Sequence, residues 1–221
     1  MPVTNIVEAV LGREQVKWDA LWRLFTWLLD AQEGHALGSK VVDEFCRHAL
    51  GTTFELRKLR REYQLSAVKD GKGKWADLAL AIPTFEAPTH IVIMDDIDRR
   101  SPGGKRKLEN LLSYRRLARE MFPLAIIRAV VLTNARDGSS MSKMYDGLGS
   151  EASDSAAVEG WKLLPLCVVG DWIEGALASS ASAPPEKMKL FLLDFVEWSK
   201  SLDSRIGGAG GPAFELPKLP Q

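Results

Sequence analysis

Two short apolar runs near the middle of the chain have the pattern of neighbouring β-strands. The first, WADLALAIP, begins at Trp75, and the second, THIVIM, ends at Met94. Apolar runs that are rich in β-branched residues and bounded by proline or charge are typical of strands buried on both faces. Because the link between them is short and contains a turn, we expect the two strands to lie side by side in the centre of a sheet.

Amphipathic helices are predicted on either side of this pair. Apolar residues recur at helical spacing over residues 14–30, and Ser39 has the position of an N-cap for a second helix that Gly51 ends. The remaining predicted elements are helices over residues 108–122, 171–178 and 185–202, and strands over residues 124–134 and 160–169.

The alternation of strands and helices predicts the fold class. Connections that are partly local and partly crossovers favour one α/β domain over residues 1–204, with a mixed central β-sheet flanked by helices. Residues 137–160 are rich in Gly, Ser, Ala and Asp and are expected to form a long surface loop. The Gly- and Pro-rich tail, residues 205–221, is predicted to be disordered.

Composition excludes several classes of protein. Lys plus Arg number 29 and Asp plus Glu number 29, so any surface for nucleic acid must be a local patch. Cys46 and Cys167 are too few for a disulfide framework or a zinc site, which suits a reducing compartment. The first residues lack the pattern of a signal peptide, and no apolar run is long enough to span a bilayer. We therefore expect a cytoplasmic protein without a membrane partner.

Aspartates at the ends of the two central strands are the first candidates for chemistry. Asp77 lies in the first strand, and the second runs directly into Asp95, Asp96 and Asp98. Carboxylates from neighbouring strands are what a Mg²⁺ site for phosphodiester hydrolysis needs. The alternative is that these aspartates cap a strand and face water.

Basic residues and one histidine are the other candidates. The run Arg57, Lys58, Arg60 and Arg61 is able to follow a phosphate backbone, or to be a solvated face. A second basic segment, expected to be a loop, contributes Arg99, Arg100 and Lys105 as nucleic-acid contacts. His35, between two glycines, is expected to stabilise a turn rather than to act as a base.

The order of several motifs resembles that of the PD-(D/E)XK nuclease superfamily, in particular a bacterial branch with the motifs LLDPxGxHxLG, IENKI and QLxxY. The matching segments, within residues 18–202, are Leu28-Leu29-Asp30, Gly34-His35-Ala36-Leu37-Gly38, the strand end Ile93-Met94-Asp95-Asp96-Ile97, and Asn110-Leu111-Leu112-Ser113-Tyr114. The resemblance implies a restriction-endonuclease-like core and Mg²⁺-dependent cleavage of DNA.

Departures from the family motifs are as informative as the matches. In the family the second strand carries Glu-x-Lys, whose Glu holds the metal and whose Lys lies beside the attacking water. Aligned on the apolar run, these positions are Met94 and Asp96, which are a poor ligand for a hard cation and the wrong charge. The glutamate of the family's first helix falls near Trp18, which is expected to fill the space beside Asp77. Glu62 is an additional candidate ligand on the preceding strand.

Two hypotheses follow. In the first, which the departures favour, Asp77 and Asp96 are residues of a degenerate site, and the protein binds nucleic acid or a partner protein, for example in bacterial defence. In the second, the protein is an active Mg²⁺-dependent DNA nuclease with ligands Asp77 and Asp95 or Asp96, and with Lys105 or Arg99 supplying positive charge. Strand alternation turns Asp95 away from Asp96, so the second hypothesis is expected to need a β-bulge.

Overall fold

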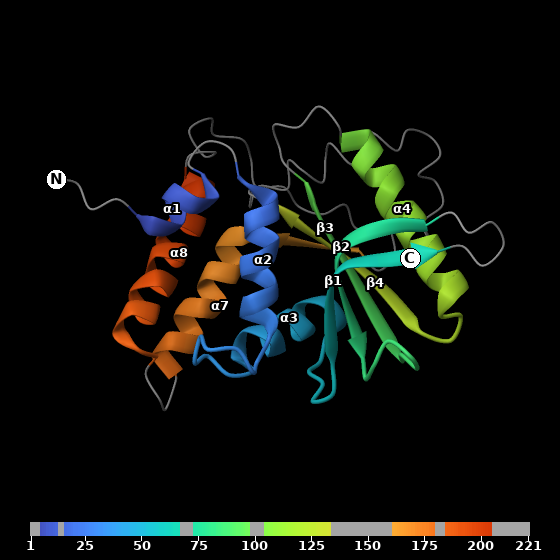
Figure 1. Cartoon of the computed structure of the whole chain (residues 1–221), viewed down its shortest axis with the longest axis horizontal. Helices are drawn as coiled ribbons and strands as arrows, with labels where there is room; N and C mark the ends of the chain where they lie inside the picture. Colours follow the sequence, from blue (N-terminus) through green and yellow to red (C-terminus); the bar gives the residue numbers. More distant parts are fainter. Residues whose placement is uncertain are drawn as a thin grey trace, which may run out of the picture.

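The centre of the fold is a five-stranded mixed sheet whose strands lie in chain order (Figure 1). The computed structural model describes residues 5–12, 16–66, 73–97, 104–133, 161–179 and 184–204. The first two strand pairs are antiparallel and the last two are parallel, so the prediction of a mixed sheet with β2 beside β3 is confirmed. The strands are β1 (Lys58–Ser66), β2 (Gly73–Ile82), β3 (His90–Ile97), β4 (Ile126–Thr133) and β5 (Trp161–Pro165).

Helices cover both faces of this sheet, as expected for an α/β fold. They are α1 (Ile6–Leu11), α2 (Trp18–Leu29), α3 (Lys40–Leu50), α4 (Gly104–Met121), α7 (Leu166–Ser179) and α8 (Glu186–Ser204). Figure 1 shows α4 on one side of the sheet and the other helices on the opposite side. The larger buried core joins α2, α3, α7 and α8 to Leu78 and Met94, and the smaller core joins α4 to Ala79 and Ile93. We call the two sides the α2 face and the α4 face.

The β1–β2 hairpin changes face part-way along its length. On β2, Leu78 packs in the core of the α2 face, but Ala76, two residues earlier, packs in the core of the α4 face. On β1, Leu59 packs against the α2-face core and Leu65 lies in the α4-face core. Side chains two residues apart on a regular strand point to the same face of the sheet. In both β1 and β2, the side chains therefore change from one face of the sheet to the other between these positions.

The reversal is located at Glu62 on β1 and at Asp77 on β2. The ladder pairs Arg61 with Leu78 and Tyr63 with Ala76, so Glu62 and Asp77 lie opposite each other between these pairs, with no slip of register. Glu62 has a φ of 47°, in the left-handed region that side chains other than glycine rarely adopt. Beyond this point the hairpin passes over α4 (Figure 1).

Several element boundaries differ from the prediction. The strand predicted over residues 160–169 ends at Pro165, and α7 begins at Leu166 instead of Asp171. The apolar run misled because Leu166, Val169 and Ile173, all buried, have helical spacing, which a run of hydrophobic residues conceals. Helix α4 begins at Gly104, so Lys105 belongs to a helix and not to a loop.

Two further differences lie near the ends of the chain. Helix α1 was not predicted; Asn5 caps it by accepting a hydrogen bond from the backbone N–H of Glu8 at 2.9 Å. The predicted loop over residues 137–160 and the tail over residues 205–221 lie outside the described residues. Among the described helices, none combines the length and the apolar character that crossing a bilayer requires.

His35 fastens the turn after α2, as predicted. Its Nδ1 accepts a hydrogen bond from the backbone N–H of Leu37 at 3.0 Å, so its Nε2 carries the hydrogen and donates to the backbone oxygen of Asp30 at 2.9 Å. The ring is fully buried beside Trp27, and burial lowers the pKa of His35. The neutral ring therefore has a structural function.

Candidate metal centre

Three aspartates from β2 and β3 converge in one cluster. One carboxylate oxygen from each of Asp77, Asp95 and Asp96 lies within 4.8 Å of the other two. Asp95 and Asp96 are buried and Asp77 is partly exposed. The β2–β3 ladder pairs Leu78 with Met94, and one step further along the same register brings Asp77 opposite Asp95. We call these three residues the acid cluster.

The route by which Asp95 joins the acid cluster differs from the expected one. The β3–β4 register runs without interruption from His90 to Ile97, so the predicted need for a bulge in β3 is wrong. Asp95 does point away from Met94, but β2 reverses its facing at Asp77 and brings that carboxylate to Asp95. The irregular backbone is therefore in the β1–β2 hairpin and not in β3, which carries Asp95 and Asp96.

Helix α2 contacts the acid cluster through Trp22. Its Nε1–H donates a hydrogen bond to Oδ2 of Asp96 at 3.3 Å, and the backbone N–H of Asp96 donates to Oδ1 of Asp95 at 2.7 Å. Trp18, the tryptophan singled out by the sequence, lies one turn earlier, and its indole packs against the core of the α2 face. Trp22 is thus the residue of α2 that donates a hydrogen bond to the acids, and the position of Trp18 beside Asp77 stays a prediction.

Helix α4 contributes a buried tyrosine and a buried arginine. Burial, and next the charges of Asp95, Asp77 and Asp96, raise the pKa of Tyr114 to about 12. Its hydroxyl therefore stays protonated and remains a hydrogen-bond donor beside the acids. Arg115, the next residue, is also buried. Neither was selected as a site residue from the sequence, where the only signal was the position of Tyr114 in the QLxxY-like motif.

The geometry of the acid cluster suits a hard divalent cation. Three carboxylates this close repel one another unless a proton or a cation lies between them. Two oxygens on one Mg²⁺ are at most about 4.2 Å apart and two on one Ca²⁺ at most about 5.2 Å, from the usual metal–oxygen distances. Separations within 4.8 Å are thus compatible with ligands of Ca²⁺, and with ligands of Mg²⁺ when they are no longer than about 4.2 Å.

Comparison with known proteins identifies no relative that would assign a function to the acid cluster. Three comparisons, by family model, by curated sequence and by solved structure, give no match. The interpretation of the centre therefore rests on the positions and the charges of its own residues.

Two of the predicted site residues have other roles in the structure. Glu62, the additional candidate ligand, is outside the acid cluster; its side chain is exposed and lies 3.7 Å from Arg61. Arg57, predicted to contact nucleic acid, is mostly buried; its Nη1 is 2.8 Å from Oδ1 of Asp43 on α3 and also donates to the backbone oxygen of Phe54. Arg57 therefore joins α3 to the start of β1.

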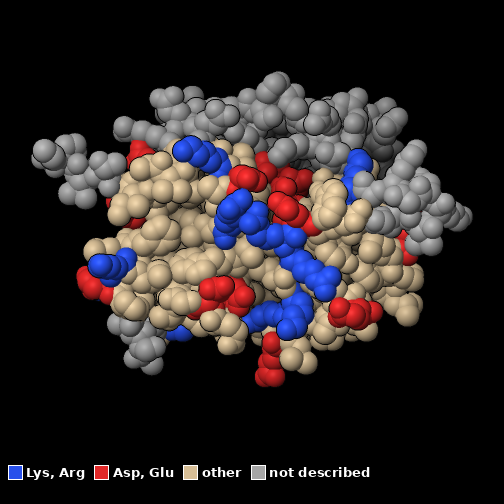
Figure 2. Space-filling model, in the orientation of Figure 1, with Lys and Arg blue, Asp and Glu red and all other residues tan. Residues whose placement is uncertain are grey.

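The structure places two further basic residues of β1 at the surface. Lys58 and Arg60 are exposed; the Arg60 guanidinium stacks on Phe85 at 4.5 Å and lies 3.5 Å from Glu86. Figure 2 shows basic side chains in a stripe over α2 and β1, next to a group of acidic side chains. Arg99 and Arg100 lie outside the described residues, as does the side chain of Lys105.

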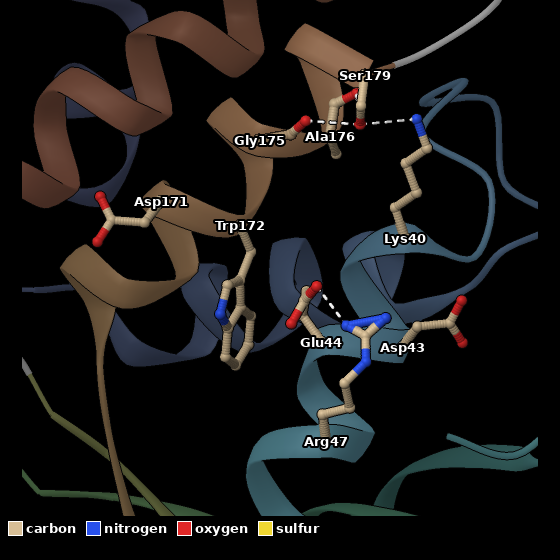
Figure 3. Close-up of a pocket in the computed structure, with 9 residues that line it drawn as sticks. All are labelled: Lys40, Asp43, Glu44, Arg47, Asp171, Trp172, Gly175, Ala176 and Ser179. Atoms are coloured by element: carbon tan, nitrogen blue, oxygen red, sulfur yellow. Dashed lines mark hydrogen bonds and ion pairs between the residues drawn. The ribbon is translucent and has the colours of Figure 1, made fainter. Parts of the chain in front are cut away.

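A second hollow, between α3 and α7, is separate from this centre. It is a cavity of about 360 Å³ lined by Lys40, Asp43, Glu44, Arg47, Asp171, Trp172, Gly175, Ala176 and Ser179 (Figure 3). Its charged groups are already paired, because Arg47 contacts Glu44, Asp43 contacts Arg57, and Lys40 Nζ donates to Ser179 Oγ at 2.9 Å. We therefore assign no ligand to this cavity.

Proposed function

We propose that the protein is a divalent-cation-dependent phosphodiesterase that acts on nucleic acid, with a restriction-endonuclease-like core of the PD-(D/E)XK type. The observation that carries this proposal is the convergence of three carboxylates, from two neighbouring strands, within 4.8 Å. Carboxylate oxygens are the preferred ligands of Mg²⁺ and Mn²⁺ in sites for phosphoryl chemistry.

The register of the sheet supports a different alignment from the one that favours a degenerate site. Aligned on the apolar run, Met94 stands at the position of the family's metal-binding glutamate. The β2–β3 pairing puts Asp95, and not Met94, opposite Asp77, and an aspartate serves the same purpose as a glutamate. Aligned in this way, the strand offers two acids, Asp95 and Asp96, at the point where the resemblance requires one.

Each residue has a distinct role in this proposal. Asp77 and Asp95 hold the cation from two strands, and Asp96, fixed by the indole N–H of Trp22, completes the ligand set. When bound, the cation would polarise a phosphoryl oxygen and lower the pKa of a water molecule toward neutrality. Tyr114, protonated at physiological pH, offers a hydrogen-bond donor beside the acids.

Arg61 is a candidate source of positive charge among the described residues. Arg61 pairs with Leu78 on β2, which in turn pairs with Met94 on β3, and both partners pack in the core of the α2 face. Residues paired across a sheet share a face, so Arg61 is on the face where Asp96 meets Trp22. From there its guanidinium is able to bind a phosphate held at the acid cluster.

The direct test measures cation binding and cleavage separately. Mn²⁺ titration followed by electron paramagnetic resonance should show one site in the wild type and at least about tenfold weaker binding in Asp77→Asn. Asp171→Asn, which removes an exposed acid from the cavity between α3 and α7, is the matched control and should bind as the wild type does. Cleavage of single- and double-stranded DNA and of RNA with Mg²⁺ or Mn²⁺ should be lost only in Asp77→Asn. Wild-type protein that neither binds Mn²⁺ nor cleaves would refute the proposal.

A second candidate function is nucleic-acid or partner binding without hydrolysis. The observation that favours it is Ile97, which stands two residues after Asp95 where the resembling family carries lysine. Without a cation at that position the charge that develops on phosphate loses one stabilising group, which typically costs a factor of about 100 to 1,000 in rate. Cation binding without cleavage, together with nucleic-acid binding that survives in Asp77→Asn, would select this candidate.

A further inference from the structure

The outer surface of α1 and α8 carries four exposed apolar side chains. Ile6 and Val10 on α1 are 60% and 51% exposed, and Leu190 and Leu193 on α8 are 55% and 40% exposed. Figure 1 shows these two helices farthest from the sheet, at the edge of the helical layer. Contiguous exposed apolar surface on a folded chain commonly marks an interaction site.

The two helices are fixed to each other, so this surface is a defined structure. The side-chain amide of Asn5 donates to the backbone oxygen of Asp194 at 2.8 Å, and the backbone N–H of Ile6 donates to Oδ2 of Asp194 at 3.1 Å. At the other end of α1, the indole N–H of Trp198 donates to the backbone oxygen of Gly12 at 2.9 Å. Ile6 is thereby held beside Asp194, which lies one helical turn from Leu190 on α8, so the exposed apolar side chains of α1 and α8 are on two adjoining helices.

Charges on α8 are arranged symmetrically about this surface. Lys189 lies four residues before Leu193, and Glu197 lies four residues after it, so all three project from one side of the helix. Both charged side chains are exposed, and neither forms an ion pair with a described residue. An exposed helix surface with an apolar centre, a cation toward one end and an anion toward the other is complementary to its own copy turned end to end.

We propose that this surface is the interface of a homodimer in which α8 packs antiparallel against α8 of a second copy, with Leu193 at the two-fold axis. In that arrangement Lys189 of each chain faces Glu197 of the partner subunit, and the interface has two such pairs. A parallel arrangement would place lysine against lysine and glutamate against glutamate, so the charges select the antiparallel one. Ile6 and Val10 of each chain extend the apolar contact at its side.

The dimensions of the helix permit an interface of this kind. Helix α8 has 19 residues, which corresponds to a length of about 28 Å at 1.5 Å per residue. Two helices in contact over that length, with α1 beside each, approach the lower range of specific interfaces, about 1,200 Å² in total. We therefore expect a dissociation constant in the micromolar range, about 1 to 100 µM.

Sedimentation equilibrium at protein concentrations from about 1 to about 100 µM tests the proposal directly. The wild type should pass from monomer to dimer over this range, and Leu193→Asp should remain monomeric, because it places two carboxylates at the axis. Leu124→Asp is the matched control: Leu124 is 96% exposed, is remote from α8 in the turn before β4, and should leave the dimer intact. Circular dichroism would verify that each variant is folded.

Exchange of the charges tests the orientation of the helices. Lys189→Glu alone and Glu197→Lys alone should each weaken the dimer, because each creates two like-charge pairs across the axis. A mixture of the two variants should dimerise as well as the wild type, since every lysine then meets a glutamate in the mixed dimer. Failure of the mixture to recover would overturn the antiparallel arrangement.

A wild-type chain that stays monomeric throughout the concentration range would overturn the homodimer. If removal of residues 205–221 then produced a dimer sensitive to Leu193→Asp, the tail would be the occupant of the surface instead. The inference is independent of the proposed catalytic function, because neither the interface nor its tests involve the acid cluster.

Discussion

Neutral hydrogen-bond donors surround the acid cluster where it meets the helices. The indole of Trp22 and the backbone N–H of Asp96 each donate to a carboxylate oxygen, and Tyr114 remains protonated. Such donors orient the carboxylates without removing their negative charge. In the proposed function these donors would prearrange the cluster for a cation, and the donor on α2 should tune how tightly one binds.

We predict that Trp22→Phe weakens Mn²⁺ binding by about 10 to 100 times, the usual effect of removing a hydrogen bond to a metal ligand. Phenylalanine keeps an aromatic ring against Phe25, so the loss of thermal stability should be small. Trp18→Phe is the control, because Trp18 is on the same helix and its indole nitrogen has no hydrogen-bond partner in the structure. Equal cation affinity in the two variants would contradict the role given to Trp22.

The buried His35 predicts a pH dependence of stability. Its pKa is lowered in the folded protein from 6.5, so the folded state binds fewer protons than the unfolded state. The stabilisation is thus complete above about pH 6.5 and is lost as the pH falls through the lower folded pKa. Urea unfolding between about pH 7.5 and about pH 5 should show a decline that is smaller in His35→Gln.

His90 serves as the comparison for this measurement. Burial, and next the charge of Arg128, lower the pKa of His90 as well, but its ring is only partly buried. His90→Gln should therefore retain most of the pH dependence. An unfolding free energy that does not change with pH would contradict the assignment of His35.

At the scale of elements, two junctions fix the helices of the α2 face in place. One is Arg57, which connects α3 to the start of β1 through Asp43 and Phe54. The other is the crossing of α7 and α8, where Gly170 lies against Ser199. The first junction depends on the charge of Arg57, and the second depends on the absence of a side chain at Gly170. Arg60 and Gly175 are residues of the same type that lack these contacts, and they serve as controls.

We expect Arg57→Ala to lower the free energy of unfolding by about 1–3 kcal/mol, because it removes the ion-pair partner of a partly buried carboxylate, Asp43. Arg60→Ala should change it by no more than about 1 kcal/mol, since Arg60 is exposed. Nucleic-acid binding should respond in the opposite order, with Arg60→Ala the more harmful. A stability loss in Arg60→Ala larger than in Arg57→Ala would show that the assignments are reversed.

Gly170→Ala should destabilise the protein by about 1–3 kcal/mol, as expected for overpacking in a core. A Cβ at this position would lie 2.3 Å from Oγ of Ser199, which is itself fully buried. Gly175→Ala is the control on the same helix; no atom lies within 4 Å of its added Cβ, and the greater helix propensity of alanine should stabilise by up to about 1 kcal/mol. Thermal unfolding of both variants gives the comparison.

At the scale of the whole molecule, the layers of the fold could be predicted from the sequence more readily than the site. The apolar runs of β2, β3 and β4 and the periodicity of α2, α3 and α8 are local patterns. The position of Asp77 cannot be predicted in this way, because the β1–β2 hairpin changes face there and packs Leu65 and Ala76 against α4, far along the chain. The hydrogen bond from Trp22 to Asp96 and the ion pair of Arg57 with Asp43 could not be predicted either, because each joins elements that no local sequence pattern brings together.

The balanced charge of the chain predicts a weak dependence of nucleic-acid binding on salt. With 29 basic and 29 acidic residues, attraction to phosphate must come from a local group of cations, such as those of β1 in the basic stripe over α2 and β1 (Figure 2). Three contacts from Lys58, Arg60 and Arg61 would give a slope of log K against log salt of about −2 to −3. Lys58→Ala should reduce that slope by about one in fluorescence-anisotropy titrations, whereas a slope steeper than about −5 would indicate a larger basic surface.

The chain-order arrangement of the sheet also has a consequence for how the molecule assembles during synthesis. Each strand pairs with the one that precedes it, so the sheet is able to grow strand by strand as the chain leaves the ribosome. The bonds from Asn5 to Asp194 and from Trp198 to Gly12 span 189 and 186 residues, and they have to wait for the last helix. We expect a nascent chain that ends before α8 to contain the acid cluster while the first helix remains undocked.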